Sequence, residues 1–249
     1  MDKSKEDLVN LSKRVRKNIL DLAFKYDDGH IAPSYSCVEI LVALYHKIMG
    51  EDDKFILSKG HACLALYAIL QSKGFNPKIS GHPDIEECEG ISCTTGSLGH
   101  GLPIGLGMAF ARKIQNKLGK IFVLLGDGEC QEGTTWESMN LINRFSINNL
   151  VVIVDNNKFQ ALDSIKIIMN EISLKAKFEA FGTNVIEVNG HSFEELFDAF
   201  NHCEGNSKPC IIIANTIKGK GLSFMENIPK WHSRLPQGDE LNKAYEELK

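Results

Sequence analysis

The sequence lacks the features that mark nucleic-acid-binding and membrane proteins. Its 28 Lys and Arg residues are outnumbered by 32 Asp and Glu residues, so the net charge is −4 and the pI is about 6.1. Without a basic stripe, nucleic-acid binding is not expected. No apolar stretch approaches the roughly 18 residues of a membrane span, and the charged residues 1–20 lack the apolar region of a signal peptide. We therefore expect a cytoplasmic protein that does not enter membranes.

The cysteines also lack the spacing of a metal site. Their number, seven, is odd, no two form a CxxC pair, and several fall within apolar runs: Cys37, Cys63, Cys88, Cys93, Cys130, Cys203 and Cys210. This pattern predicts reduced thiols in the core of a cytosolic protein rather than a zinc site.

Internal repeats and Pro- or Ser-rich linkers are absent too, so we expect residues 1–249 to form a single domain. Apolar, β-branched runs predict buried parallel strands at 121–125, 150–155, 184–188 and 210–215, with 55–58 as a weaker candidate. Apolar residues at helical spacing predict helices within 8–22, 38–45 and 193–200. This alternation predicts an α/β fold with a doubly wound, mostly parallel sheet flanked by helices.

What the sequence does contain is a polar turn after each of two predicted strands. GDGECQE (126–132) follows the first, and DNN (155–157) follows the second. Ligands of such sheets bind beyond the carboxyl ends of the strands, so the two turns are expected to converge. Asp127 and Asn157 offer oxygen ligands for Mg²⁺, and the flanking glycines would let backbone N–H groups approach a diphosphate. Taken alone, GDG is equally compatible with a plain tight turn.

Seven motifs, in order, then resemble the N-terminal region of transketolase, a thiamine-diphosphate enzyme. They are GHIAPSYSCVEIL (29–41), FILSKGHACLALYAIL (55–70), GHPD (81–84), TTGSLGHGLPIGLGMA (94–109), GDGECQEGTTWE (126–137), VDNNKFQ (154–160) and TIKGKG (216–221). The resemblance covers nearly the whole chain and stops where the second and third domains of that family would begin. The chain thus resembles the N-terminal, diphosphate-binding subunit of a split transketolase.

The resemblance implies roles for individual residues. Mg²⁺ would be bound by Asp127, Asn157 and the carbonyl of Phe159. Contacts to thiamine diphosphate would come from His61, Leu98, Gly126, Asp127, Gly128, Glu129, Asn157 and His232. Catalytic roles would fall to His30, His61, His82, His232 and Glu132. Imidazoles suit such a site because they donate to phosphate and hydroxyl oxygens and exchange protons near neutral pH.

Other interpretations stay open for several of these residues. A lone histidine is usually a surface residue or a satisfied core residue, and His46, His191 and His202 keep that interpretation. His100 either lines the pocket or caps the following helix. Glu132 belongs either to a buried acidic network that crosses a subunit interface or, like Glu137, to a solvated helical face.

The resemblance also implies a partner. In the family, the carboxylate that activates the aminopyrimidine ring comes from a pyrimidine-binding domain, and no segment here resembles that domain. A C-terminal, pyrimidine-domain subunit is therefore expected, with two copies of each chain in a heterotetramer. Together the chains would transfer a two-carbon ketol unit from a ketose phosphate to an aldose phosphate, as in the pentose phosphate pathway.

Three alternatives remain. One is a related thiamine-diphosphate enzyme, either similar to deoxyxylulose-phosphate synthase or specialised for another sugar, although TTGSLGHG and GHP favour transketolase. The second is a non-catalytic, regulatory half. The third, a dinucleotide-binding enzyme, is disfavoured because GLPIGLGMA is not a GxGxxG motif directly after a strand.

Overall fold

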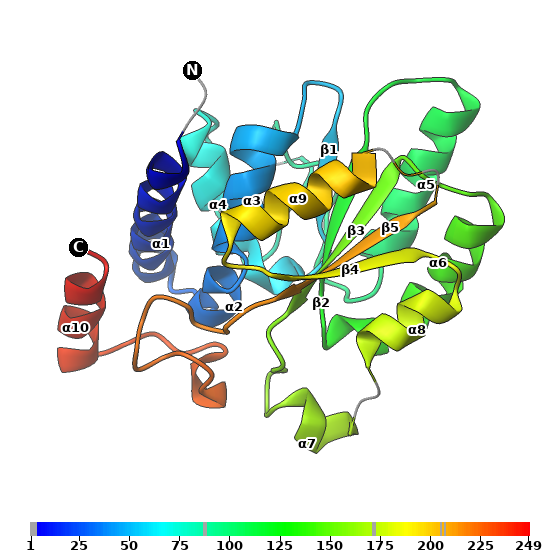
Figure 1. The fold of residues 1–249 in the computed structure, drawn as a ribbon. Helices are drawn as coiled ribbons and strands as arrows, with labels where there is room; N and C mark the ends of the chain where they lie inside the picture. Colours follow the sequence, from blue (N-terminus) through cyan, green and yellow to red (C-terminus); the bar gives the residue numbers. More distant parts are fainter. Residues whose placement is uncertain (1–3, 87–88, 171–172, 205, 207) are drawn as a thin grey trace.

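Five strands form one parallel sheet in the order β1-β2-β3-β5-β4 (Figure 1). The structure is a computed structural model that describes residues 4–86, 89–170, 173–204, 206 and 208–249. The strands are β1 (Lys54–Leu57), β2 (Ile121–Gly126), β3 (Leu150–Asn156), β4 (Asn184–Asn189) and β5 (Cys210–Asn215). All five predicted strands are confirmed, including the weaker candidate at 55–58.

Helices connect and cover the strands. The α-helices are α1 (Lys5–Tyr26), α2 (Ile31–Tyr35), α3 (Val38–Ala43), α4 (Cys63–Ser72), α5 (Gly101–Ile114), α6 (Gly133–Arg144), α7 (Ile165–Met169), α8 (Leu174–Ala180), α9 (Phe193–Glu204) and α10 (Asp239–Glu247). A π-helical turn, η1 (Leu44–Ile48), extends α3, and 3-10 turns occur at η2 (Gly60–Ala62), η3 (Glu129–Gln131) and η4 (Pro229–Trp231). The three predicted helical segments are confirmed in α1, in α3 with η1, and in α9.

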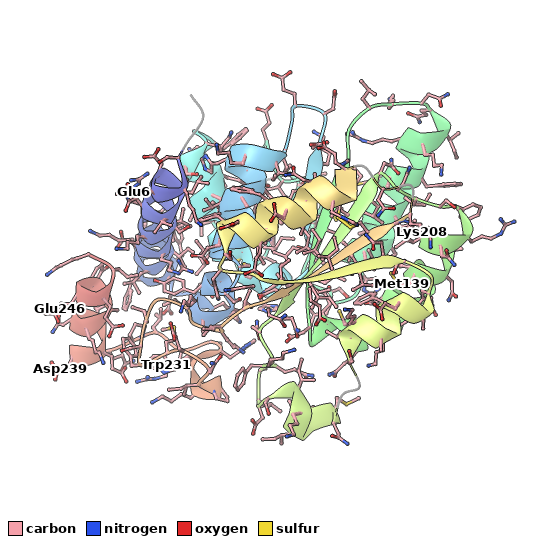
Figure 2. All side chains as sticks on the ribbon, in the orientation of Figure 1. Glu6, Met139, Lys208, Trp231, Asp239 and Glu246 are labelled. Atoms are coloured by element: carbon pink, nitrogen blue, oxygen red, sulfur yellow. A yellow bond between two sulfur atoms is a disulfide. The ribbon has the colours of Figure 1, made fainter. Side chains whose placement is uncertain are left out.

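The sheet separates two apolar layers because successive residues of a strand point to opposite faces. Phe122 and Leu124 of β2 pack with α1, α3, α4 and α9, whereas Val123 and Leu125 pack with α5, α6 and α8 (Figure 1). Met139 of α6 is fully buried in the second layer, while Glu6 and Lys208 extend from the surface (Figure 2). Helices cover both faces of the parallel sheet, so its ligands are expected beyond the carboxyl ends of the strands.

The first and last helices lie side by side, and α10 packs next to the C-terminal part of α1 (Figure 1). The hydroxyl of Tyr245 donates to Asp21 at 2.8 Å. α1 begins at a capping box in which Ser4 accepts from the backbone N–H of Asp7. Among the described residues, no helix combines the length and the apolar character needed to cross a bilayer.

Two expectations need correction. The run 184–188 is not a buried strand: β4 lies at the sheet edge, pairs only with β5, and buries only Val188. The cysteines are not all reduced, because Cys203 at the end of α9 and Cys210 at the start of β5 form a disulfide. The topology brings these two ends together, which their spacing of seven residues does not reveal. Cys37, Cys63, Cys93 and Cys130 are free and buried, as expected, and Cys88 lies outside the described residues.

Candidate active site at the carboxyl edge of the sheet

The two polar turns converge as predicted. Gly126 pairs with Asp155 at the end of the β2–β3 ladder, and the N–H of Asp127 donates to the carbonyl of Asp155 at 3.2 Å. The Asp127 carboxylate accepts from the N–H of Gly128 at 2.8 Å and from that of Lys158, so it belongs to both turns. Lys158 has a positive φ of 70°, which turns the chain back towards Asp127.

Asp127 and Asn157 are buried with their oxygen atoms held by backbone N–H groups. The side-chain oxygen of Asn157 accepts from the N–H of Phe159 at 3.0 Å. Burial, together with the nearby Asp155 carboxylate, raises the pKa of Asp127 to about 7. A cation placed against Asp127 would remove this penalty, so the donor set fits a hard cation such as Mg²⁺.

A cavity of about 380 Å³ opens over these turns. Every predicted site residue except His30 lines it: His61, His82, Leu98, Gly126, Asp127, Gly128, Glu129, Glu132, Asn157, Phe159 and His232. The cavity is large enough to hold a substantial part of a cofactor. In the described part of the chain, no three His, Cys, Asp or Glu side chains are grouped to hold a metal. A cation here would therefore depend on amide, carbonyl and ligand oxygens as well as on Asp127.

One wall of the cavity has unused hydrogen-bond donors. Within the described residues, the side-chain nitrogens of Gln131 and Gln160 are buried and have no hydrogen-bond partner. Gly128 lies between the turns, and a Cβ there would come within 2.8 Å of the Cγ of Gln160. Orphaned donors beside a glycine, where a Cβ would displace Gln160, fit an anionic group such as a diphosphate.

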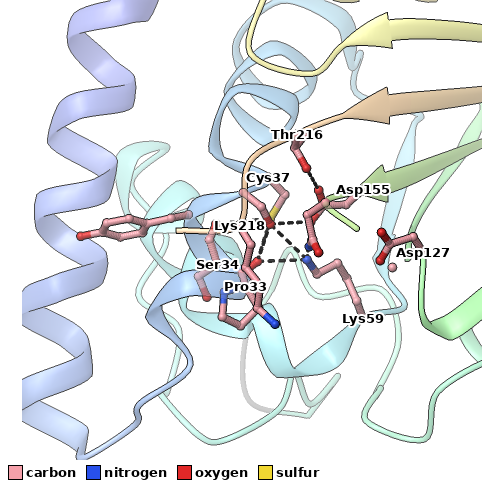
Figure 3. A network of polar contacts seen from close by, with 12 residues as sticks. Pro33, Ser34, Cys37, Lys59, Asp127, Asp155, Thr216 and Lys218 are labelled. Carbon is pink, nitrogen blue, oxygen red and sulfur yellow. Dashed lines mark hydrogen bonds and ion pairs between the residues drawn. The ribbon is translucent and has the colours of Figure 1, made fainter. Parts of the chain in front are cut away.

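A buried ion pair between Lys59 and Asp155, which was not predicted from the sequence, lies beside the two turns (Figure 3). The ammonium of Lys59 contacts Asp155 and donates to the carbonyl of Pro33 at 3.0 Å. Asp155 also accepts from Ser36 and Thr216. Burial alone would lower the pKa of Lys59 and raise that of Asp155, but their contact reverses both directions, so both groups stay charged.

Lys218 is the second cation that the sequence analysis missed. It comes from TIKGKG, is 1% exposed, and lines the cavity. Its ammonium donates to the carbonyl of Gln160 at 2.8 Å and lies 2.8 Å from Nδ1 of His232. Burial and the charge of Lys59 lower the pKa of Lys218 to about 8. Because Lys59 is paired with Asp155, Lys218 is the lysine of this cavity whose charge is left to attract an anion.

Three of the predicted histidines form a cluster. The ring centroids of His30, His61 and His232 lie 5.4–6.0 Å apart. Burial and Lys59 lower the pKa of His61 to about 2, and burial and Lys218 lower the pKa of His232 to about 3. Both are therefore neutral near pH 7. His82 lies apart from this cluster, with its ring against Gly96.

The loops that bear His30 and His232 touch through their backbones. A Cβ at Gly29 would lie 2.3 Å from the carbonyl oxygen of Ser233, so only glycine fits there. This contact places the two histidines together although they are far apart in the sequence.

The carboxylates of the GDG turn differ in environment. Glu129 is buried and accepts from the N–H groups of Gly99 at 2.8 Å and Gly126 at 3.0 Å, and from the hydroxyl of Ser58. It therefore braces the turn. Glu132 is not buried in this single chain, nor is Glu137. A buried acidic network around Glu132 therefore remains a prediction for an assembled enzyme. His100 is exposed and adds no side-chain cap to α5.

His191, which the sequence analysis left as an ordinary histidine, belongs to a buried network behind the Lys218 loop. Glu39 accepts from both terminal nitrogens of Arg16, at 2.7 and 2.8 Å, and contacts Nδ1 of His191 at 2.8 Å. His191 accepts from the N–H of Ile217 at 2.9 Å, and Nε of Arg16 donates to the carbonyl of Lys220 at 2.7 Å. The network therefore holds the loop on both sides of Lys218.

Comparisons with known proteins agree with this geometry. A family model described as "Transketolase, thiamine diphosphate binding domain" matches residues 9–248. The chain is 37% identical to a Phocaeicola vulgatus protein that is named as one subunit of an apulose-4-phosphate transketolase, with 98% of this chain and 94% of that protein covered. It is 34% identical to the 6-deoxy-6-sulfo-D-fructose transketolase subunit SqwG of Clostridium sp., with 91% of this chain and 90% of that protein covered.

Among solved structures, the transketolase of Campylobacter jejuni superposes with a TM-score of 0.89 at 29% identity. The match covers 99% of this chain and 43% of that one, so the chain spans less than half of the length of that transketolase. The chain belongs to the transketolase family. It is an N-terminal, thiamine-diphosphate-binding subunit of a transketolase-type enzyme.

Proposed function

We propose that this protein binds Mg²⁺ and thiamine diphosphate and, with its partner, transfers a two-carbon ketol unit from a ketose phosphate to an aldose phosphate. The observation that carries the proposal is the convergence of three features on one cavity. These are the paired oxygen donors of Asp127 and Asn157, the glycine and glutamine wall, and the histidine cluster. A plain tight turn would need neither the glycine and glutamine wall nor the histidine cluster.

The residues of the cavity divide the task of binding. Asp127, Asn157 and the Phe159 carbonyl would hold Mg²⁺. The backbone at Gly126 and Gly128, with His61 and His232, would contact the diphosphate, and Leu98 would pack against the cofactor rings. Glu129 keeps the turn in shape. When bound, thiamine diphosphate supplies the carbanion-stabilising thiazolium that this chemistry needs.

The catalytic residues of this chain would be His30, His61, His82, His232 and Glu132. The neutral rings of His61 and His232 can accept a hydrogen bond or a proton from a hydroxyl group. His82 lies at the exposed end of the cavity, where a sugar would enter. Glu132, which is not buried here, would meet the partner chain.

The partner would be a C-terminal chain that carries the pyrimidine-binding domain, and the assembly a heterotetramer. Two lines support this. The relatives of similar length are named as transketolase subunits, and the solved transketolase is more than twice as long as this chain. The aminopyrimidine-activating carboxylate would come from that partner.

The substrates would be sugar phosphates, as in the pentose phosphate pathway. The relatives are named for different sugars, apulose 4-phosphate and 6-deoxy-6-sulfo-D-fructose, so a specialised ketose donor is the second candidate. We place the protein in the cytoplasm on the basis of the four free, buried thiols among the described residues. The Cys203–Cys210 disulfide argues against that location, and thiol labelling of freshly lysed cells would decide it.

Ketol transfer from xylulose 5-phosphate to ribose 5-phosphate tests the function. The assay includes thiamine diphosphate and Mg²⁺, with this chain alone, a candidate pyrimidine-domain partner alone, and the mixture. Activity in the mixture only is the expected result. Activity of this chain alone would contradict the need for a partner. Activity of the mixture with apulose 4-phosphate but not with xylulose 5-phosphate would favour the specialised enzyme.

A further inference from the structure

Asp28 is a half-buried carboxylate next to the histidine cluster, and neither the sequence motifs nor the proposed function gives it a role. It follows α1, whose C-cap residue Asp27 has a positive φ of 54°. One carboxylate oxygen of Asp28 accepts from the backbone N–H of His30 at 3.0 Å and lies 2.7 Å from Nδ1 of its ring. The Asp28 side chain is only 13% exposed.

The position of this carboxylate is fixed from two sides. The N–H of Asp28 donates to the carbonyl of Ala23 at 3.0 Å, which ties it to the last turn of α1. The next residue, Gly29, packs directly on the backbone of Ser233. Burial tends to raise the pKa of Asp28, but hydrogen bonds and charge from His30 outweigh it, and the pKa lies below its usual value. Asp28 is therefore an ionised acceptor with a fixed direction.

Within the described residues, His30 is the only member of the cluster with such a partner, since no carboxylate hydrogen-bonds His61 or His232. Nδ1 of His232 instead accepts from the ammonium of Lys218, so a proton on that nitrogen would put two cations in contact. Burial and Lys59 keep His61 neutral, with a pKa of about 2.

The charges around His30 agree with this difference. The groups that face it are Asp28 on its own loop and the neutral rings of His61 and His232. Lys59 and Lys218 are the cations that lower the pKa values of those two rings, and His82 lines, with His30, a neighbouring cavity of about 420 Å³. Among the residues that the structure describes, Asp28 is the one carboxylate that is hydrogen-bonded to the cluster.

We propose that Asp28 is a positioning residue that holds the Nδ1–H of His30 and thereby directs Nε2 of that ring towards the substrate. This rests on the proposed function, in which His30 meets the substrate. Nε2 of His30 has no hydrogen bond to a described residue and is the nitrogen left for a substrate oxygen. The proton passes between Nε2 and that oxygen, while Nδ1 keeps its proton and Asp28 stays ionised.

Two substitutions separate the hydrogen bond from the charge. Asp28→Asn keeps an acceptor oxygen for Nδ1 but removes the charge, and Asp28→Ala removes both. Asp27→Asn is the matched control, because it removes a neighbouring carboxylate and Asn tolerates the left-handed conformation of that position. All are made in the full chain.

The first readout is ¹⁵N NMR of the histidine rings in this chain alone, with His30→Gln to assign the signals. We expect a protonated Nδ1 of His30 in the wild type, in Asp27→Asn and in Asp28→Asn, and its loss in Asp28→Ala. An unchanged His30 spectrum in Asp28→Ala would overturn the proposal. This measurement requires no activity, so it decides the Asp28–His30 contact even if ketol transfer is never observed.

The second readout is kcat in the mixture with the partner. General acid–base groups contribute about 10²–10⁴-fold, so we expect both Asp28 variants to lose roughly tenfold or more. Thiamine diphosphate affinity and the activity of Asp27→Asn should stay at wild-type levels. A purely structural role predicts instead that Asp28→Asn, which keeps the hydrogen bond, retains full kcat, and that result would refute a role for the Asp28 charge in the reaction.

Discussion

Glu39→Gln should destabilise the fold strongly and in a pH-dependent way. Burial raises the pKa of Glu39, but Arg16 and His191 outweigh it and lower the pKa from 4.5 to about 2. At 1.36 kcal/mol per pKa unit, this difference corresponds to about 3 kcal/mol of stability. Because the folded-state pKa is the lower one, the stabilisation is complete above pH 4.5 and is lost as the pH falls towards 2. A Gln leaves the Arg16 guanidinium buried and unpaired, which typically costs about 3–5 kcal/mol.

The assay is urea unfolding of the wild type and of Glu39→Gln at several pH values from 7 to 3. The two free energies of unfolding should differ most near pH 7 and converge below pH 4.5. Glu194→Gln is the control: its partner Lys5 is at 3.2 Å, but both side chains are more than half exposed, so the change should stay within about 1 kcal/mol. A Glu39→Gln difference below about 1 kcal/mol at pH 7, or one that does not change with pH, would refute the reasoning.

Three further predictions concern the cavity. Asp127→Ala should abolish Mg²⁺-dependent binding of thiamine diphosphate while circular dichroism stays native; wild-type affinity in calorimetry would remove Asp127 from the metal site. Gly128→Ala should push Gln160 into the cavity and weaken cofactor binding about tenfold, with little change in melting temperature; unchanged affinity would mean that the wall does not meet the cofactor. Gly99→Ala should lower stability by about 1–2 kcal/mol or more, because φ is +82° and the methyl group would lie 2.5 Å from Thr134; an unchanged denaturation midpoint would contradict this.

The strands were predictable because each is a short apolar run with a strong local signal. β2, β3 and β5 are buried on both faces, so their runs are continuous. β4 has a similar apolar, β-branched run but lies at the edge, and its exposure depends on its neighbour rather than on its own residues. The π-helical turn after α3 and the closure of the Cys203–Cys210 disulfide are likewise set by packing.

The site residues that lie in sequence motifs could be predicted. The ion pairs between residues that are far apart in the sequence could not. Asp127 and Asn157 stand in recognisable turns after strands. Lys59 and Asp155 adjoin the same motifs, but their pairing joins segments 96 residues apart. Asp28 forms a local contact, yet only the positions of His61 and His232 show why it differs from an ordinary surface carboxylate. The burial of a residue and the charges around it depend on the assembled fold, so neither can be predicted from a short segment of sequence.

The close contact between Gly29 and the backbone of Ser233 also limits which sequence changes this enzyme can accept. Any side chain at Gly29 would collide with backbone, so the two histidine loops can only change in concert. A substitution at Gly29 is therefore a poor starting point for a new sugar preference. We expect changes of sugar preference to arise more readily at the exposed residues around His82 and in the partner chain.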